Sequence, residues 1–117
     1  PRNAVALNNL ARVYQLRGDP QARATAEKAF LLDPSAQNAD TLGWILTRGG
    51  DPARGLVLLR QAAPGDPRFA YHLGVALNDV GQKENAVKVL NAVVAVKGDF
   101  TEKADARKLL EQITKGS

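Results

Sequence analysis

Cysteine and methionine are absent from the chain, and histidine occurs once, as His72. Without cysteine the chain can form neither a disulfide framework nor a thiolate nucleophile. One histidine also cannot supply the several histidine and cysteine ligands that the common zinc sites need. We therefore expect no metal and no cofactor.

Aromatic residues and long apolar runs are also scarce. The chain has three Phe, two Tyr and one Trp, although 44% of its 117 residues are hydrophobic. A core built from Ala, Leu and Val suits closely packed helices. No apolar run approaches the roughly 18 residues of a membrane span, and no signal peptide is visible, so we expect no membrane contact from this segment. The lack of methionine and the start at Pro1 predict a piece of a longer protein.

The excess of charge is small, because 16 Lys and Arg against 12 Asp and Glu leave a net charge of +4. No block of basic residues is interleaved with aromatic residues, so nucleic acid is not an expected partner. The mild positive charge either steers an acidic partner towards the protein or simply keeps its surface soluble.

What the chain does contain is an internal repeat. One short pattern occurs three times with steps of three, one and three residues, which places its members on one face of an α-helix. The third member is always small, so a second helix can approach closely. The rows are Leu7-Leu10-Ala11-Tyr14, Ala39-Leu42-Gly43-Leu46 and Ala70-Leu73-Gly74-Leu77.

A glycine follows each small position by seven residues, and a second helical pattern follows each glycine. In the clearest case, Asp51 is a good N-cap and Pro52 suits the first helical position. Each unit is therefore predicted to be a helix, a tight turn and a helix. The turn glycines are Gly18, Gly50 and Gly81, and the second-helix rows are Ala22-Ala26-Ala29, Gly55-Leu59-Ala62 and Ala86-Leu90-Val93.

Capping residues predict where the helices begin. Asn3, Asp19, Ser35 and Asp66 precede helical patterns, and Pro20 is expected to open the second helix.

The end of the second unit and the last helix have their own signals. Pro64 is expected to end its helix early, because proline cannot continue a helix interior. Asp99 and Glu102 have capping-box spacing. We predict a single all-α domain over residues 1–117, with units at about 3–34, 35–66 and 67–98 and a capping helix at 101–114.

These features together resemble the tetratricopeptide repeat (TPR). Leu-Gly or Leu-Ala is followed by an aromatic residue or leucine, a Gly-Asp turn, alanines spaced four and three, and Asp-Pro. The resemblance covers about residues 3–98, with departures at Gly98, where proline is usual, and at Gln82-Lys83 in the third turn. It implies an α-α superhelix that binds protein or peptide partners along its concave side and is not an enzyme.

Five stretches carry a narrower resemblance: Asn8-Asn9-Leu10-Ala11, Gly18-Asp19-Pro20, Ala26-Glu27-Lys28-Ala29, residues 40–46 and residues 71–77. They resemble the C-terminal part of bacterial PEP-CTERM-system TPR-repeat lipoproteins. Those proteins accompany exosortase-type sorting and exopolysaccharide systems. The resemblance implies an extracytoplasmic bacterial location, periplasmic or outer-membrane associated, with a lipid anchor on the parent protein.

The first helix of each TPR unit lines the concave groove, so the periodicity assigns residues to it. Trp, Tyr and Arg are enriched in binding hot spots, where truncation costs about 2 kcal/mol or more. Amides can both donate to and accept from a peptide backbone, and arginines meet carboxylates bidentately. The expected partner-binding residues are Asn8, Asn9, Arg12, Asp40, Thr41, Trp44, Arg48, Arg68, Tyr71, His72 and Asn78.

The sequence leaves a second interpretation open for most of them. Trp44 and Tyr71 either anchor a partner or pack between units, Asn9 either binds peptide or serves an inter-unit contact, and each arginine is either a ligand or a solvated side chain. Cochaperones of the family that grip a terminal carboxylate use a Lys/Asn/Asn/Lys/Arg set. The matching positions hold Asn8, Arg12, Thr41, Arg68 and His72. Only the Arg68 position keeps a cation where the family has one, so chaperone-tail binding is not expected.

The sequence gives little support for a set of catalytic residues. Ser35 and His72 form part of a triad only if Ser35 is not a helix cap. Asp40 and Asp79 form a carboxylate pair only if they are neither solvated nor paired with Arg48. The leading hypothesis is a non-catalytic protein-interaction module. The alternatives are an architectural spacer or self-association segment of a longer repeat protein, and a carbohydrate-binding groove that stacks sugars on Trp44 and Tyr71.

Overall fold

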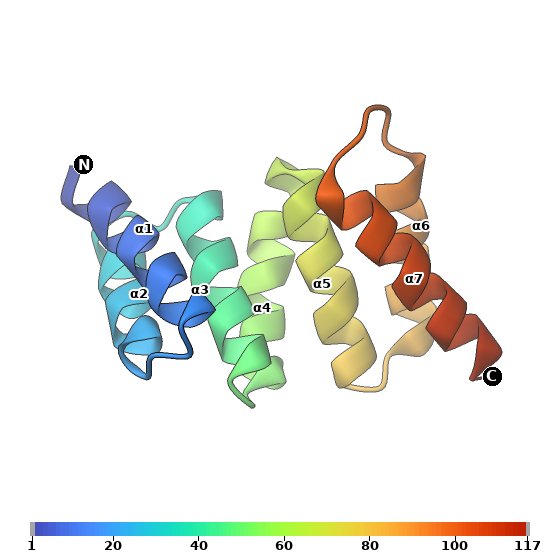
Figure 1. Cartoon of the computed structure of the whole chain (residues 1–117), viewed down its shortest axis with the longest axis horizontal. Helices are drawn as coiled ribbons and strands as arrows, with labels where there is room; N and C mark the ends of the chain where they lie inside the picture. Colours follow the sequence, from blue (N-terminus) through green and yellow to red (C-terminus); the bar gives the residue numbers. More distant parts are fainter. Residues whose placement is uncertain (1, 117) are drawn as a thin grey trace.

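The computed structural model describes residues 2–116, and regular structure over this range is helical. Consecutive helices form antiparallel pairs, α1 with α2, α3 with α4, and α5 with α6, and α7 covers the last pair (Figure 1). The elements are α1 (Arg2–Leu16), α2 (Gln21–Leu32), α3 (Ala36–Arg48), α4 (Pro52–Ala62), the 3-10 turn η1 (Ala63–Gly65), α5 (Pro67–Asp79), α6 (Lys83–Ala95) and α7 (Thr101–Lys115).

The predicted glycine turns are confirmed. Gly18, Gly50 and Gly81 have positive φ angles of 69°, 93° and 85°, a region that costs glycine little. In each turn the next residue donates its N–H to a carbonyl five residues earlier, at distances of 2.8, 2.8 and 2.9 Å. This bond satisfies a carbonyl that the helix end leaves free, so the second helix of each pair starts at once.

Several predicted helix starts are also confirmed. The side chains of Ser35, Asp51 and Asp66 accept hydrogen bonds from backbone N–H groups at the starts of α3, α4 and α5. Asp19 accepts from the N–H of Gln21, although Pro20 occupies the N-cap position and does not open α2.

Two predicted caps are wrong. Asn3 lies inside α1, which already begins at Arg2. The N-cap position of α7 is Phe100 and makes no side-chain cap bond, so Asp99 and Glu102 form no capping box there. Instead, Lys103 reaches back and donates to the carbonyls of Val96 and Gly98 at 2.6 and 2.9 Å, which ties the loop to the helix.

Proline ends α4 early, as predicted. The helix stops at Ala62, and Pro64 lies in the short turn η1 before Asp66 caps the next helix. The connection between α4 and α5 is therefore compact.

Small residues set the close approach within the pairs. A Cβ on Gly43 would lie 2.9 Å from Cγ of Leu59 and 3.1 Å from the carbonyl oxygen of Gly55. A Cβ on Gly74 would lie 2.6 Å from Cδ2 of Leu90. Glycine at these positions lets the two helices of a pair meet without overlap.

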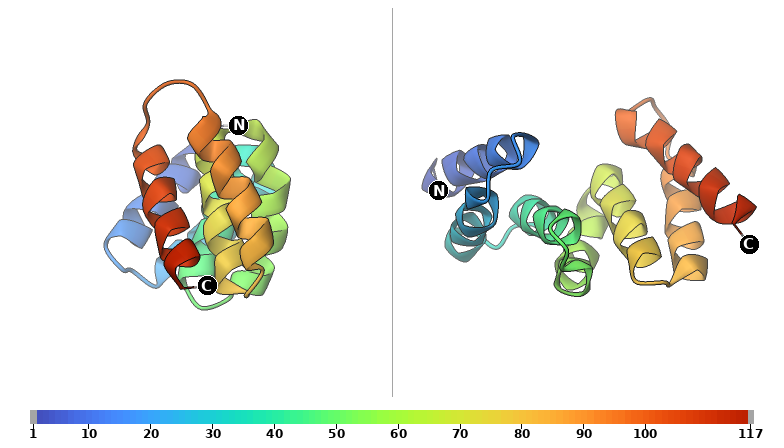
Figure 2. Two further views of the ribbon diagram at one scale, coloured as in Figure 1. Left: turned by 90° about the vertical axis from the view of Figure 1, so that its right-hand side faces the viewer. Right: turned by 60° about the horizontal axis from the view of Figure 1, so that its bottom comes forward.

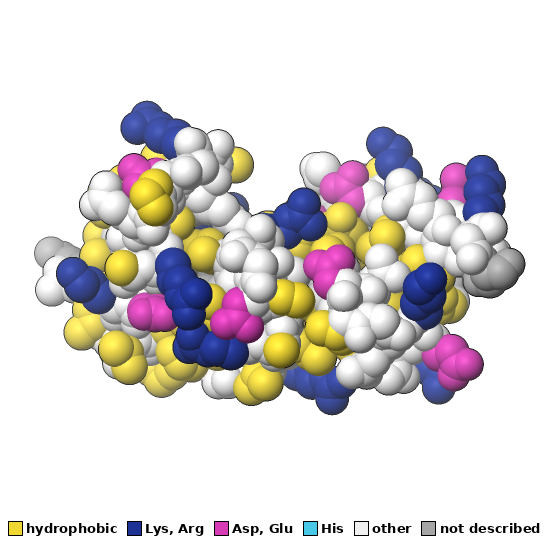
Figure 3. All heavy atoms as spheres, turned by 90° about the horizontal axis from the view of Figure 1, so that it is seen from below, with side chains coloured by type: hydrophobic (Ala, Val, Ile, Leu, Met, Phe, Trp, Pro, Cys, Tyr) yellow, Lys and Arg dark blue, Asp and Glu magenta, His cyan; other side chains and the backbone are white. Residues whose placement is uncertain are grey.

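The stacked pairs form a curved body with two faces. Helices α1, α3, α5 and α7 line the inner face, whereas α2, α4 and α6 form the outer face (Figure 2). The molecule measures 42 × 29 × 23 Å. Seen edge-on, the inner face is hollowed between the α1 end and the α7 end (Figure 3). Two clusters of buried side chains fill the body. One surrounds Leu46 and comes from α1, α2 and α3. The other surrounds Leu77 and Leu90 and comes from α4, α5, α6 and α7.

Candidate functional site

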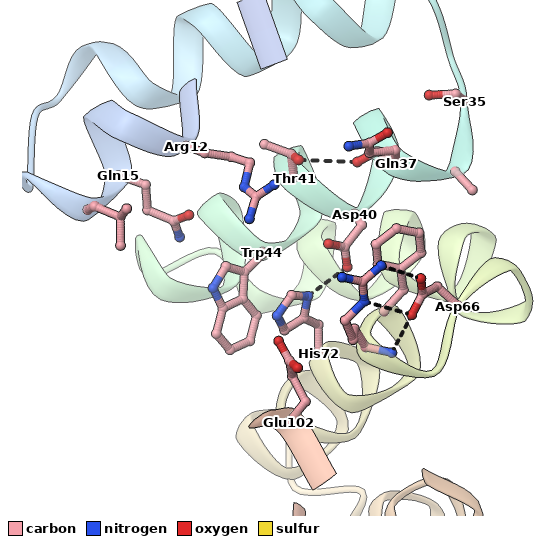
Figure 4. Close-up of a pocket in the computed structure, with 14 residues that line it drawn as sticks. Arg12, Gln15, Ser35, Gln37, Asp40, Thr41, Trp44, Asp66, His72 and Glu102 are labelled. Carbon is pink, nitrogen blue, oxygen red and sulfur yellow. Dashed lines mark hydrogen bonds and ion pairs between the residues drawn. The ribbon is translucent and has the colours of Figure 1, made fainter. Parts of the chain in front are cut away.

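The inner face holds a groove of about 600 Å³, here called the inner groove. Its walls come from α1, α3, α5 and α7, together with the loops before α3 and α5. The close-up shows side chains from these elements converging on one space (Figure 4). The lining residues are Arg12, Gln15, Leu16, Ser35, Ala36, Gln37, Asp40, Thr41, Trp44, Asp66, Arg68, Phe69, His72 and Glu102.

A polar pair joins α3 to α5 at the floor of the inner groove. Asp40 Oδ1 and His72 Nδ1 lie 2.7 Å apart in a hydrogen bond, and both side chains are largely covered, at 9% and 17% exposure. Burial raises the pKa of the Asp40 carboxyl above its usual value, and the contact with His72 offsets part of this rise. The expectation that Asp40 is solvated or paired with Arg48 is therefore wrong, because its carboxylate is buried and bonded to His72.

An aromatic cluster lies beside this pair. The rings of Trp44 and His72 stack with centroids 4.0 Å apart and an interplanar angle of 21°, and the Tyr71 ring lies 6.3 Å from that of Trp44. The guanidinium of Arg48 lies 5.4 Å from the centre of the Trp44 ring. Trp44 thus both lines the inner groove and contacts the next helix pair, so both interpretations of this residue have a structural basis.

Arg68 does not project freely into the inner groove. Its guanidinium donates to Asp66 at 3.1 and 2.7 Å, and its backbone N–H donates to the same carboxylate at 2.8 Å. The side-chain bond from Arg68 holds the pKa of Asp66 below its usual value. One carboxylate therefore caps α5 and also fixes the arginine.

The structure gathers most of the predicted residues and leaves three outside. Arg12, Asp40, Thr41, Trp44, Arg68 and His72 line the inner groove, while Arg48 and Tyr71 border it through ring contacts. Asn8 is buried at 2% exposure, and its Oδ1 has no hydrogen-bond partner among residues 2–116, so it is not available at the surface as predicted. Asn9 and Asn78 are not among the lining residues.

Sequence reasoning missed several lining residues, among them Asp66 and Glu102. Asp66 was predicted only to cap a helix. Arg68 lies two residues after it, and this spacing permits the ion pair between the two side chains. Glu102 belongs to the capping helix, whose first turn closes one end of the inner groove. The repeat pattern does not extend to this helix, so it could not predict where Glu102 lies.

Neither the Ser35–His72 set nor a metal-ligand cluster is assembled in the described residues. Ser35 accepts the N–H of Asn38 as the cap of α3 and lies apart from His72 (Figure 4). No group of three or more metal-binding side chains comes together within residues 2–116. Over the same range, every helix is too short or too polar to cross a bilayer.

The stacked antiparallel helix pairs, the glycine turns and the concave groove define a TPR-like helical repeat fold. No protein-family model matches the chain. The chain is similar to a TPR repeat-containing protein of Pseudomonas aeruginosa, at 35% identity over 79 residues, which are 65% of this chain and 32% of that protein. The chain thus spans about a third of the length of this curated relative. The similarity supports the TPR character of the repeats and protein–protein interaction as the general class of function.

Proposed function

We propose that the chain is a non-catalytic interaction module that binds a peptide segment of a partner protein in the inner groove. The observation that carries this proposal is the convergence of Trp44, His72 and Arg12 from three helices on one concave space. Gln15, Gln37 and Thr41 add amide and hydroxyl groups, which suit a peptide backbone.

Trp44 is the expected anchor of the bound peptide. A partly exposed indole supplies large contact area at little entropic cost, and such rings dominate binding energies at interfaces. Peptides selected from a displayed random library, then synthesised, provide the probe for isothermal titration calorimetry. Trp44→Ala should weaken their binding at least about tenfold, which is roughly 1.4 kcal/mol.

The matched control is Val57→Ala, which removes an exposed apolar side chain from the outer helix α4. This variant should bind as the wild type does. Circular dichroism should show unchanged helicity for both variants. A library that yields no peptide dependent on the inner groove, or full affinity in Trp44→Ala, contradicts the proposal.

A second candidate is self-association or stacking through the open side of α1. Leu10 and Val13 are 40% and 42% exposed, whereas the equivalent residues in the next unit, Leu42 and Ile45, are 3% and 7% exposed. Apolar positions that are buried in one unit and bare in another favour a covering partner.

Light scattering tests this candidate. We expect a concentration-dependent dimer that Leu10→Lys abolishes and that Leu32→Lys, on the outer helix α2, leaves intact. A strict monomer at high concentration rejects self-association.

We also propose an extracytoplasmic bacterial setting linked to polysaccharide export or protein sorting. The support is the resemblance of five sequence stretches to PEP-CTERM-system lipoproteins. Recovery of the native protein in the cytoplasmic fraction of its cells would argue against this setting.

A further inference from the structure

The inner groove carries opposite charges on opposite walls. Arg12 projects from α1 on one side, and Glu102 projects from the first turn of α7 on the other (Figure 4). Trp44 and His72 lie between them. A ligand that crosses the aromatic floor therefore meets a cation at one end and a carboxylate at the other.

The remaining charged groups of the inner groove are already paired. Asp40 is bonded to His72, and Asp66 holds Arg68 at 2.7 Å. Neither Arg12 nor Glu102 forms an ion pair with a described residue. The charge of Arg12 acts on Asp40, and that of Glu102 acts on Arg68, over distances longer than an ion pair. Among the described residues that line the inner groove, Arg12 and Glu102 are thus the two charged groups that no ion pair holds.

The α7 wall favours a basic side chain for a second reason. Asp105, one turn beyond Glu102, lies close enough to Tyr71 for its charge to act on the ring hydroxyl. The charges of Glu102 and of Arg48 act on the same hydroxyl, so a cation placed there would meet two carboxylates and one arginine beside an aromatic ring, and the carboxylates outnumber the arginine. On the α1 wall, the guanidinium of Arg12 suits a carboxylate, which it can bind bidentately.

Resting on the proposed function, we propose that the inner groove selects a bipolar peptide segment, with an acidic side chain against Arg12 and a basic side chain against Glu102. The segment is oriented by these two charges, because the reversed placement sets like charge against like charge at both walls. An apolar or aromatic residue between the two charged ones lies over Trp44.

Charge reversal with compensation tests the assignment. Peptides selected against the wild type should carry one acidic and one basic residue on either side of an apolar residue. Arg12→Glu should weaken the selected peptide at least about tenfold, and the same peptide with lysine in place of its acidic residue should recover that loss. Glu102→Lys should be compensated in the same way by a peptide with glutamate in place of its basic residue.

Arg60→Glu is the matched control. Arg60 is exposed on the outer helix α4, and its reversal changes the net charge by the same amount as Arg12→Glu. It should change affinity no more than about twofold, through long-range attraction alone.

The outcomes separate this inference from the proposed function. Selected peptides without the acidic and basic pair, or equal effects of Arg12→Glu and Arg60→Glu, overturn the charge assignment and leave the inner groove as a peptide site. A failure to select any peptide that depends on Trp44 overturns the proposed function, and the bipolar assignment with it.

Discussion

At the scale of single residues, Asp40 is a buried polar group that connects two helix pairs. It is a buried carboxylate whose bond to His72 links one helix pair to the next. The pair also fixes the imidazole against Trp44, since a ring held at one nitrogen keeps its orientation. A polar contact therefore sets the shape of the groove floor at the place where apolar packing would ordinarily join two units.

The raised pKa of Asp40 gives a prediction for stability. An acid whose pKa is higher in the folded state binds protons better when folded, so the free energy of unfolding should fall as pH rises from about 3.8 to the raised value. The loss is about 1.4 kcal/mol for each pH unit between the folded and unfolded pKa values. Urea denaturation over a pH series should show that Asp40→Asn lacks this slope.

The control for that experiment is Asp66→Asn. The pKa of Asp66 is lowered, so its contribution is present above about 3.8 and is lost as pH falls through the folded value. The free energies of unfolding of the two variants should therefore differ from that of the wild type in different pH ranges, and the two differences should change with pH in opposite directions. Parallel curves for Asp40→Asn and the wild type would mean that burial of Asp40 does not govern its titration.

At the scale of helices, the spacing between partners depends on glycine at facing positions. The α3/α4 pair is the tightest example, because Gly43 and Gly55 face each other and the hydroxyl of Thr47 donates to the Gly43 carbonyl at 2.8 Å. In the α5/α6 pair, Gly74 instead faces the side chain of Leu90, which can shift. The two pairs should thus differ in their tolerance of an added methyl group.

Gly55→Ala should destabilise the protein more than Gly74→Ala does. A Cβ on Gly55 would overlap the Thr47 hydroxyl and lie 2.6 Å from the Gly43 carbonyl, which is backbone and cannot move alone. Overpacking at Gly74 should cost about 1–3 kcal/mol, offset by the gain of about 1 kcal/mol from replacing glycine in a helix. Urea midpoints measure both, and a Gly55→Ala variant as stable as the wild type would show that glycine does not set the α3/α4 spacing.

At the scale of the whole molecule, the groove differs in charge from the rest of the chain. Helices α2, α4 and α6 contain six Lys and Arg and two Asp and Glu. Their net charge is therefore +4, the same value as the net charge of the entire chain. The inner groove is lined by two arginines and three carboxylates. The mild basicity seen in the composition therefore does not describe the groove, which suits a partner with charges of both signs.

The sequence predicted the helices, turns and packing faces better than it predicted the groove. Periodicity and local caps depend on neighbours in the chain, so Gly50, Asp51 and Pro64 could be interpreted correctly. The bond between Asp40 and His72 joins residues 32 positions apart, and its formation depends on how two helix pairs stack. Asn8 was misplaced for the same reason, since a polar residue off the apolar stripe is buried only when a neighbouring element covers it.

The stack of Trp44 on His72 has a practical consequence, because Trp44 is the sole indole of the chain. Its fluorescence comes from one known place, so the emission spectrum is an optical readout of the groove floor without any attached dye. Occupancy of the groove, the protonation of its neighbours and the stacking of α5 on α3 all act on the same fluorophore, and a single spectrum follows them in real time.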